Sequence, residues 1–425
     1  MHARRLARTL LVAALTAACA DAPVDSTGTS DGEAETGAVE RDPMGFEVDP
    51  PGLWLAGDLH VHATGASNDT GGDSLPADIA ARARAIGLAF VVLTDHSNST
   101  GSDPTTTDED PALFNRGPEF PLWDEAAALS VAGEFILVSG NELSPVAEGD
   151  LPQTPTGHIG CVPGDLDDFD VDSPFIDRPR GQVTGGDALA QARARGCFTI
   201  VNHPYAFATW INYDWTSREY DAMEVWNGSG DGLDDFDMQG HAAWRCDLLQ
   251  GRAVTPIAAS DNHRVHIEPP GEPLDPPLGW PVTEVFAERL EWPAIMAGLS
   301  AGRVALGEGD SRLYLDGYDG ARLRHEGAET RVLRLRGRLD ARATSAVLEL
   351  RRATACDDPR PEPDRVTITD VALHEQTVAG GESFDVAVDI AGEPGVYTAT
   401  LLTGAPQLFG GARYSALSRA IVLGV

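Results

Sequence analysis

Six of the 11 histidines of this chain stand at the ends of short apolar runs. The first two, His60 and His62, belong to the stretch GDLHVH and are separated by one residue. On a strand, residues i and i+2 point to the same side, so one cation can bind both imidazoles. A single histidine beside a strand is more often a hydrogen-bonded structural residue than a ligand. The joint pattern, rather than any one histidine, therefore indicates a metal site.

The other four histidines of this pattern lie at later apolar runs, and most of the six have a carboxylate near them. These residues are Asp95 and His96 in TDHS, Glu142 in GNEL, His158 in TGHIG, His203 in VNHP, and Asp261 with His263 in SDNH. Imidazole and carboxylate ligands without thiolate suit Zn or Mn, with Fe as a further option, and argue against copper(I) and calcium. The chain is therefore expected to bind divalent metal ions in a cluster.

Seven apolar runs between residues 53 and 260 carry these residues: LWLAGDL, LAFVVLT, EFILVSG, HIGCV, CFTIVN, AMEVW and VTPIAAS. Most are continuous, as is typical of parallel strands buried on both faces. Helical patterns separate them at about 76–86, 121–132, 186–195 and 240–249. The repeated βαβ order predicts an α/β barrel or an open doubly wound sheet.

Three long insertions follow candidate strands, at residues 97–117, 163–183 and 266–281. We expect them on one side of the sheet, which in barrels is the side of the active site. After residue 306, apolar and polar residues alternate between Gly/Pro turns, which predicts a small antiparallel β-sandwich. The sequence thus predicts a metal-binding domain over 51–305 and a C-terminal β-domain over 306–425.

The N-terminus has the features of an export signal. Three arginines precede the apolar segment Leu10–Leu15, and small residues precede Cys19. The segment is too short for a permanent transmembrane helix. Residues 1–19 resemble a bacterial lipoprotein signal with Cys19 as the lipidated residue, the alternative being plain cleavage near Ala18. Residues 20–50 are acidic and poor in apolar residues, which predicts a disordered tether. We expect an exported, periplasmic or cell-envelope lipoprotein whose membrane contact is the lipid anchor.

The charge of the chain excludes one class of partner. There are 66 acidic residues against 31 basic ones, a net charge of −35, and no lysine. Such a chain repels nucleic acid, because binding there depends on neutralising phosphates. A small-molecule substrate is expected instead, and no motif indicates an oligomeric state.

Four cysteines remain after the signal, and export permits disulfides between them. Cys161 could pair with Cys197, and Cys246 with Cys356, but spacing does not decide among the three possible pairings. No CxxC motif is present, so a cysteine-ligated zinc site is not expected.

The order HxH, TDH, Glu, GH, HP and DxH over residues 53–305 resembles the PHP (polymerase and histidinol phosphatase) superfamily. GDLHVH, VVLTDHS, EVWNG and ASDNH resemble its CehA-like branch, named for a carbaryl hydrolase. The resemblance implies a distorted (β/α)7 barrel and a cluster of two or three metal ions. It also implies the ligands: His60, His62, Glu142 and Asp261 for the first ion; Glu142, His158 and His203 for the second; His96, His263 and Asp69, or alternatively Asp73, for the third.

Other residues receive roles around this cluster. A hydroxide bound by the cluster is the expected nucleophile, since bound cations lower the pKa of water to about 7. Asp58 and Asp95 are expected to orient ligand imidazoles through their second nitrogen. Asp95 is also a candidate proton donor, and Arg264 a candidate contact for an anionic substrate, with a loop ion pair weighed equally. The remaining candidates are Trp226 and Asn227 for the pocket wall, His266 for substrate contact, and His241 as a structural residue.

Three functions remain open. The first is hydrolysis of small phosphate mono- or diesters outside the cytoplasm. The second is hydrolysis of a carbamate or carboxylic ester at the same site, as the CehA resemblance suggests. The third is a metal- or ligand-binding lipoprotein without turnover. A DNA-processing role is disfavoured by the export signal and the acidic charge.

Overall fold

The computed structural model describes residues 48–425 except 50, 68, 71, 73, 97–118, 146–156, 173–182, 207–212, 214, 216, 229–235, 270–274, 319–322, 325–329, 362–364 and 405–412. The expected signal with Cys19, almost all of the tether, Asp73 and the first long loop lie outside these residues. Within them, no helix is both long and apolar enough to span a membrane.

The described residues form a mixed α/β fold in which strands dominate and one sheet is large. All seven apolar runs are strands. Strands β2 (Leu53–Val61), β3 (Phe90–Leu93) and β4 (Ile136–Ser139) pair in parallel. One residue after β4, the chain enters a second sheet with the order β5-β6-β7-β8-β9. Its strands are β5 (Asn141–Leu143), β6 (His158–Pro163), β7 (Cys197–Asn202), β8 (Ala222–Asn227) and β9 (Thr255–Ala259).

Backbone hydrogen bonds join the ends of these two sheets. The Asp261 amide donates to the His60 carbonyl at 2.9 Å, and the His62 amide donates to the Asn262 carbonyl at 2.9 Å. On the other side, the Glu142 amide donates to the Asp95 carbonyl at 3.0 Å. The segment after β9 is thereby fixed beside the end of β2, and the start of β5 beside the end of β3. These contacts bring several strand ends to one place.

Strand β6 departs from the expected parallel arrangement, because it runs antiparallel to both β5 and β7. All six of its residues are buried. A continuous apolar run reports burial on both faces, which an antiparallel strand inside a fold also has. The apolar run HIGCV therefore does not distinguish a parallel strand from an antiparallel one.

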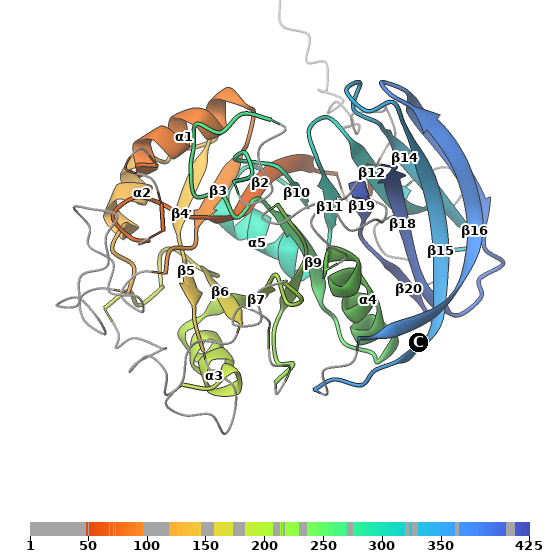
Figure 1. Cartoon of the computed structure of the whole chain (residues 1–425), viewed down its shortest axis with the longest axis horizontal. Coiled ribbons are helices and arrows are strands. Elements are labelled where there is room, and N and C mark those ends of the chain that lie inside the picture. Colours follow the sequence, from red (N-terminus) through yellow and green to blue (C-terminus); the bar gives the residue numbers. More distant parts are fainter. Residues whose placement is uncertain are drawn as a thin grey trace, which may run out of the picture. The chain divides into compact units, whose positions relative to one another are not determined.

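Five helices occur among the described residues: α1 (Pro76–Ala85), α2 (Trp123–Leu129), α3 (Gly185–Arg195), α4 (Phe236–Leu249) and α5 (Trp292–Ser300). Helix α3 shows clear end signals, since Thr184 Oγ1 accepts from the Asp187 amide and Gly196 ends the helix at φ 96°. Figure 1 shows α1 and α2 beside β3 and β4. Helix α5 was not predicted from the sequence, because its residues are almost all apolar and lack a polar face.

The large sheet continues beyond the first half of the chain. From β2 it passes through β10 (Val282–Ala287) and β11 (Val304–Gly307) to β19 (Arg413–Ser418), β18 (Gly395–Thr403), β15 (Ser345–Asp357) and β16 (Thr367–Ala379), with β20 (Ile421–Leu423) beside β18. Because β11 crosses residue 305 inside one continuous sheet, the domain boundary there stays a prediction.

A second five-stranded sheet packs in the C-terminal part. It contains β1 (Val48–Asp49), β13 (Leu323–Arg324), β12 (Arg312–Tyr318), β14 (Val332–Arg338) and β17 (Ser383–Asp389). Leu333 and Leu335 alternate with arginines along β14 and share one core with Leu348 and Leu350 of β15. The leucines of β14 are thus buried, in agreement with the alternation that the sequence shows in this region.

Two disulfides are present. Cys161–Cys197 joins β6 to β7, and Cys246–Cys356 joins α4 to β15 across 110 residues of sequence. The structure thus selects one of the three pairings that spacing left open.

Candidate metal centre

The structure brings all nine predicted metal ligands together at the joined strand ends. Their potential ligand atoms form four overlapping groups in which the atoms of each group lie within 4.8 Å of one another. The groups are His60, His62 and Glu142; His60, His203 and Asp261; His96, Glu142 and His158; and His62, Asp69, His96 and His263.

Glu142 lies at the middle of the cluster and is 1% exposed. Its Oε1 lies 3.0 Å from His60 Nε2, 3.1 Å from His158 Nδ1 and 3.3 Å from His203 Nε2. Its Oε2 lies 3.6 Å from His62 Nε2 and 3.4 Å from His96 Nδ1. One carboxylate therefore faces five imidazoles, which is the arrangement expected of a bridging ligand.

Two aspartates complete the cluster. Asp261 Oδ1 lies 3.2 Å from the Nε2 atoms of both His60 and His62. Asp69 Oδ2 lies 3.2 Å from His96 Nε2 and 3.3 Å from His263 Nε2. Asp69, the first choice of the sequence analysis, thus lies at the cluster, while the alternative Asp73 falls outside the described residues. His62 belongs to the group around Asp69 as well as to the first group, which the resemblance did not imply.

The residues present fit divalent cations. The Nε2 atoms of His60 and His62 are buried and make no hydrogen bond. They face carboxylate oxygens at 3.0–3.6 Å instead. Two ligand atoms that share a tetrahedral cation at about 2.1 Å lie roughly 3.4 Å apart. The spacing inside the cluster is therefore that of ligands around a common ion.

Backbone strain is concentrated at the same place. His203 has φ 27° and Asp261 has φ 56°, both in the left-handed region that residues other than glycine rarely adopt. Such conformations persist only where the surroundings hold them, and they gather at functional sites. Both side chains face the cluster, so the strain coincides with the site.

Glu224 on β8 holds the second nitrogen of a ligand, a role that the sequence analysis missed. Its Oε1 lies 3.1 Å from His60 Nδ1, and its Oε2 accepts from the His203 amide at 2.7 Å and from Asn227 Nδ2 at 2.9 Å. Glu224 is 2% exposed. The signal was available, because a carboxylate inside the apolar run AMEVW needs a buried partner.

Asp95 acts on His62 through an intermediate. His62 Nδ1 lies 2.9 Å from Ser67 Oγ, which lies 3.2 Å from Asp95 Oδ1, and the Ala63 amide donates to the same oxygen at 2.6 Å. Burial raises the pKa of Asp95 to about 7, although these hydrogen bonds oppose the shift. Asp95 thus reaches the imidazole of His62 through Ser67.

The hydrogen-bond partners of Asp58 include Ser260 and the Gly279 amide, rather than an imidazole. It accepts from Ser260 Oγ at 2.5 Å, from the Ser260 amide at 3.1 Å and from the Gly279 amide at 2.8 Å. Burial raises its pKa to about 6 against these hydrogen bonds. The expected role as partner of a ligand imidazole belongs instead to Glu224.

Among the remaining candidates, Asn227 contacts a predicted ligand, because its Nδ2 donates to Asp261 Oδ2 at 3.4 Å. Arg264 is half-exposed and pairs with Asp275 at 3.3 Å, the alternative that the sequence had left open. Trp226 is fully buried, with its ring 5.8 Å from that of Tyr414. His241 Nδ1 lies 3.0 Å from the Tyr414 hydroxyl, and His266 is exposed.

The electrostatics of the cluster favour ionised carboxylates. Burial would raise the pKa of Glu142, but His158 and His60 hold that pKa well below its usual range. Burial lowers the pKa of His62 to about 4, with His263 adding to the effect. Burial opposes protonation of His263 as well, yet Asp69 raises its pKa to about 9. Ionised carboxylates beside neutral imidazoles such as His62 are the forms that bind metal ions.

Comparisons with known proteins give distant likenesses. No family model matches the chain, and no curated protein matches it. A solved Bacteroides vulgatus structure, described as a two-domain protein containing a predicted PHP-like metal-dependent phosphoesterase, is 17% identical, with a TM-score of 0.44 over 89% of this chain and 100% of that one.

Two further structures are less similar. The lesion-specific endonuclease Q of Pyrococcus furiosus is 13% identical, with a TM-score of 0.34 over 58% of this chain and 56% of that one. A putative metal-dependent phosphoesterase from Bifidobacterium adolescentis is 15% identical, with a TM-score of 0.33 over 52% of this chain and 90% of that one. At this distance the geometry of the cluster, rather than the neighbours, bears on function.

Proposed function

We propose that this chain is a metal-dependent hydrolase of the PHP type that binds two or three divalent cations, with Zn and Mn preferred. The observation that carries the proposal is the position of Glu142, whose two oxygens face five imidazoles inside a buried cluster. A carboxylate shared in this way fits a bridging ligand of a catalytic cluster better than a scavenging site, which usually consists of mobile histidine-rich tracts.

In such a site, some residues would hold the cations and others orient the ligand imidazoles. Bound cations supply an activated water at neutral pH and positive charge toward the oxygens of the substrate. Glu142, Asp261 and Asp69 would hold the cations together with the six imidazoles. Glu224 and Ser67 fix the rings of His60 and His62 through their Nδ1 atoms, so the Nε2 atoms stay directed into the cluster. The geometry is therefore set before substrate arrives.

The same proposal extends to the fold and to the family. The hydrogen bonds between β2 and the segment after β9 support a distorted seven-stranded (β/α)7 barrel. The separate hydrophobic core that contains Leu333, Leu335 and Leu348 supports a β-domain after residue 305. The strand-end motifs support the CehA-like branch of the PHP superfamily. An N-terminal lipid anchor at Cys19 would place the enzyme in the cell envelope.

Small phosphate mono- or diesters are the proposed substrates. One ligand group, around Asp261, includes His60, which faces Glu142 Oε1. Another, around Asp69, includes His62 and His96, which face Glu142 Oε2. Cations in such neighbouring groups match a phosphoryl group, which offers several oxygens and develops charge on both the attacking and the leaving oxygen. An ester or carbamate carbonyl offers a single oxygen of this kind.

A substrate panel tests the proposal. The purified protein, loaded with Zn or Mn, is offered an aryl phosphomonoester, an aryl phosphodiester, an aryl carbamate, an aryl carboxylic ester and a duplex DNA with an abasic site. We expect turnover of at least one phosphoester and loss of turnover in EDTA. Preference for the carbamate or carboxylic ester would retain the hydrolase and change its substrate. Less than one metal ion per chain, together with no turnover on the panel, would refute the proposal that this chain is an enzyme.

A further inference from the structure

The connection between β7 and β8 has an unusual construction. Its described residues, 203–206, 213, 215 and 217–221, contain no helix. Aromatic rings pack there instead: the ring of Trp215 lies 5.3 Å from that of Tyr205 and 5.2 Å from that of Tyr213. The Tyr213 amide donates to the Pro204 carbonyl at 3.2 Å, so this aromatic group lies directly behind His203.

Two of the described residues in this connection have strained backbone conformations. His203 and Trp215 both have positive φ, at 27° and 60°. Neither residue is glycine, so both conformations need support from the surrounding structure. Because His203 is a proposed metal ligand, the support for this connection bears on the metal centre.

Part of that support comes from the C-terminal half of the chain. Arg360, which follows β15, lies with its guanidinium 4.9 Å from the centre of the Trp215 ring. It also pairs with Asp247 on α4 at 2.8 Å and with Asp358 at 2.7 Å. Its side chain is 1% exposed. A buried arginine in this position is held on one side by carboxylates and on the other by the aromatic ring.

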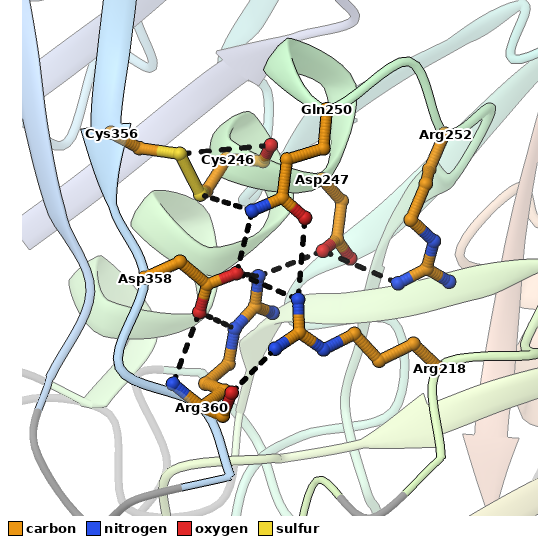
Figure 2. Close-up of a disulfide and its surroundings, with 8 residues drawn as sticks. All are labelled: Arg218, Cys246, Asp247, Gln250, Arg252, Cys356, Asp358 and Arg360. Atoms are coloured by element: carbon orange, nitrogen blue, oxygen red, sulfur yellow. Dashed lines mark hydrogen bonds and ion pairs between the residues drawn. A yellow bond between two sulfur atoms is a disulfide. The ribbon is translucent and has the colours of Figure 1, made fainter.

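The connection reaches back toward the same place. Arg218 donates to Asp358 Oδ2 at 2.7 Å and to the Arg360 carbonyl at 2.8 Å, as Figure 2 shows. Tyr220 donates to Asp247 Oδ2 at 2.6 Å. Two residues of the β7–β8 connection are therefore bound to the acceptors that also hold Arg360.

The Cys246–Cys356 disulfide anchors this contact. It joins α4 to the end of β15, one residue before Asp247 and two residues before Asp358. Gln250 Nε2 donates to Asp358 Oδ2 at 2.8 Å in the same view (Figure 2). The disulfide thus links the segment that carries Arg360 covalently to α4. Arg360 therefore contacts Trp215 from an anchored segment.

We propose that Arg360 is a positioning residue for the metal ligand His203. By holding Trp215 and Asp247 together it fixes the β7–β8 connection, and the connection keeps His203 in its strained conformation. The C-terminal region is then part of the metal centre without supplying a ligand. This inference rests on the proposed function only in taking His203 as a ligand.

The test uses R360Q in the full-length protein, with R334Q as the matched control. Arg334 also pairs with a carboxylate, Asp385 at 2.6 Å, and lies 4.8 Å from the ring of Tyr318, but it does so on β14. Hydrogen exchange is measured on peptides covering 199–206 and 217–221. Zinc affinity is measured by competition with a chromophoric chelator.

We expect R360Q to raise exchange in both peptides and to weaken the affinity of one zinc ion roughly tenfold, the low end for residues that orient ligands. R334Q should match the wild type in both measurements, and R360K, which keeps the charge without the flat stacking group, should lie between. A folded R360Q protein with wild-type exchange and wild-type zinc affinity would overturn the proposal.

D358N keeps the inference testable if R360Q does not fold. It preserves the shape of Asp358 while weakening its bonds to Arg218 and Arg360, so the same changes are expected with smaller size. Unchanged exchange and zinc affinity in folded D358N would also overturn the proposal. Failure of the wild type to bind zinc would count against the proposed function, whereas the exchange comparison would still decide whether Arg360 anchors the connection.

Discussion

Two of the buried clusters of opposite charges, one around Glu142 and one around Arg360, are built in different ways. Around Glu142, imidazole nitrogens and carboxylate oxygens lie 3.0–3.6 Å apart, and the Nε2 atoms of His60 and His62 make no hydrogen bond. Around Arg360, the guanidinium meets Asp247 and Asp358 at 2.7–2.9 Å.

The difference separates a binding site from a structural contact. Short, directed bonds between an arginine and a carboxylate compensate both groups for the hydration that they lose on burial. The longer spacing around Glu142 leaves several buried lone pairs directed at common points, which cations would occupy. We therefore expect the stability of the cluster around Glu142 to depend on bound cations. The cluster around Arg360 is expected to be stable without an added ion.

Removal of metal should have the largest effect. EDTA should abolish turnover and lower the melting temperature, because a site filled at 1,000 times its Kd contributes about 4 kcal/mol to folding. Calorimetry with EDTA, and again after Zn or Mn is restored, measures the change. An identical melting temperature in the two states would mean that the cluster around Glu142 stabilises itself, as the cluster around Arg360 does.

Matched substitutions in the two clusters should have opposite signatures. E142Q keeps the shape of the central side chain but removes its charge, so we expect at least one ion per chain to be lost and turnover to fall at least a hundredfold. D247N should weaken the affinity of one metal ion no more than about tenfold, while costing about 3 kcal/mol of stability because it leaves Arg360 with one carboxylate fewer. Metal analysis and urea unfolding of both proteins provide the comparison. Metal loss in D247N equal to that in E142Q would erase the distinction.

E224Q should have an intermediate effect. The amide retains a polar atom near His60 Nδ1 but loses the charge that favours the required ring orientation, so metal affinity should fall 10- to 100-fold. E349Q is the control, since Glu349 forms its ion pair with Arg351 on β15. Chelator competition measures both variants. Equal affinities would show that Glu224 is a packing residue.

Much of the metal centre was predictable because strands impose a simple geometry. His60 and His62 share a side of β2 by alternation, and Asp261 and His263 follow the end of β9. Glu224 was not predicted from the sequence, although a carboxylate within a buried strand is a stronger signal than Trp226 and Asn227 of the same motif. The role of Ser67 could not be predicted, because it depends on where a loop folds back onto His62.

The fold was less predictable where the sequence carries no directional information. The apolar run of β6 is equally compatible with parallel and antiparallel pairing, and its neighbours along the sheet decide. Helix α5 lacks the polar face by which an amphipathic helix is recognised. The contact of Arg360 with Trp215 joins residues 145 positions apart, and no local pattern reports such a contact.

Arg264 should show the smallest effect, although it directly follows the ligand His263. Its side chain is 50% exposed and paired with Asp275, and exposed ion pairs contribute about 0–1 kcal/mol. R264Q is therefore expected to change kcat/KM less than about twofold on the best phosphoester of the panel and to leave metal content unchanged. A tenfold fall for an anionic substrate, with no change for a neutral ester, would instead show that Arg264 leaves Asp275 to bind the substrate. Arg264 would then be a ligand-binding residue, like those around Glu142, rather than a structural ion-pair residue like those around Arg360.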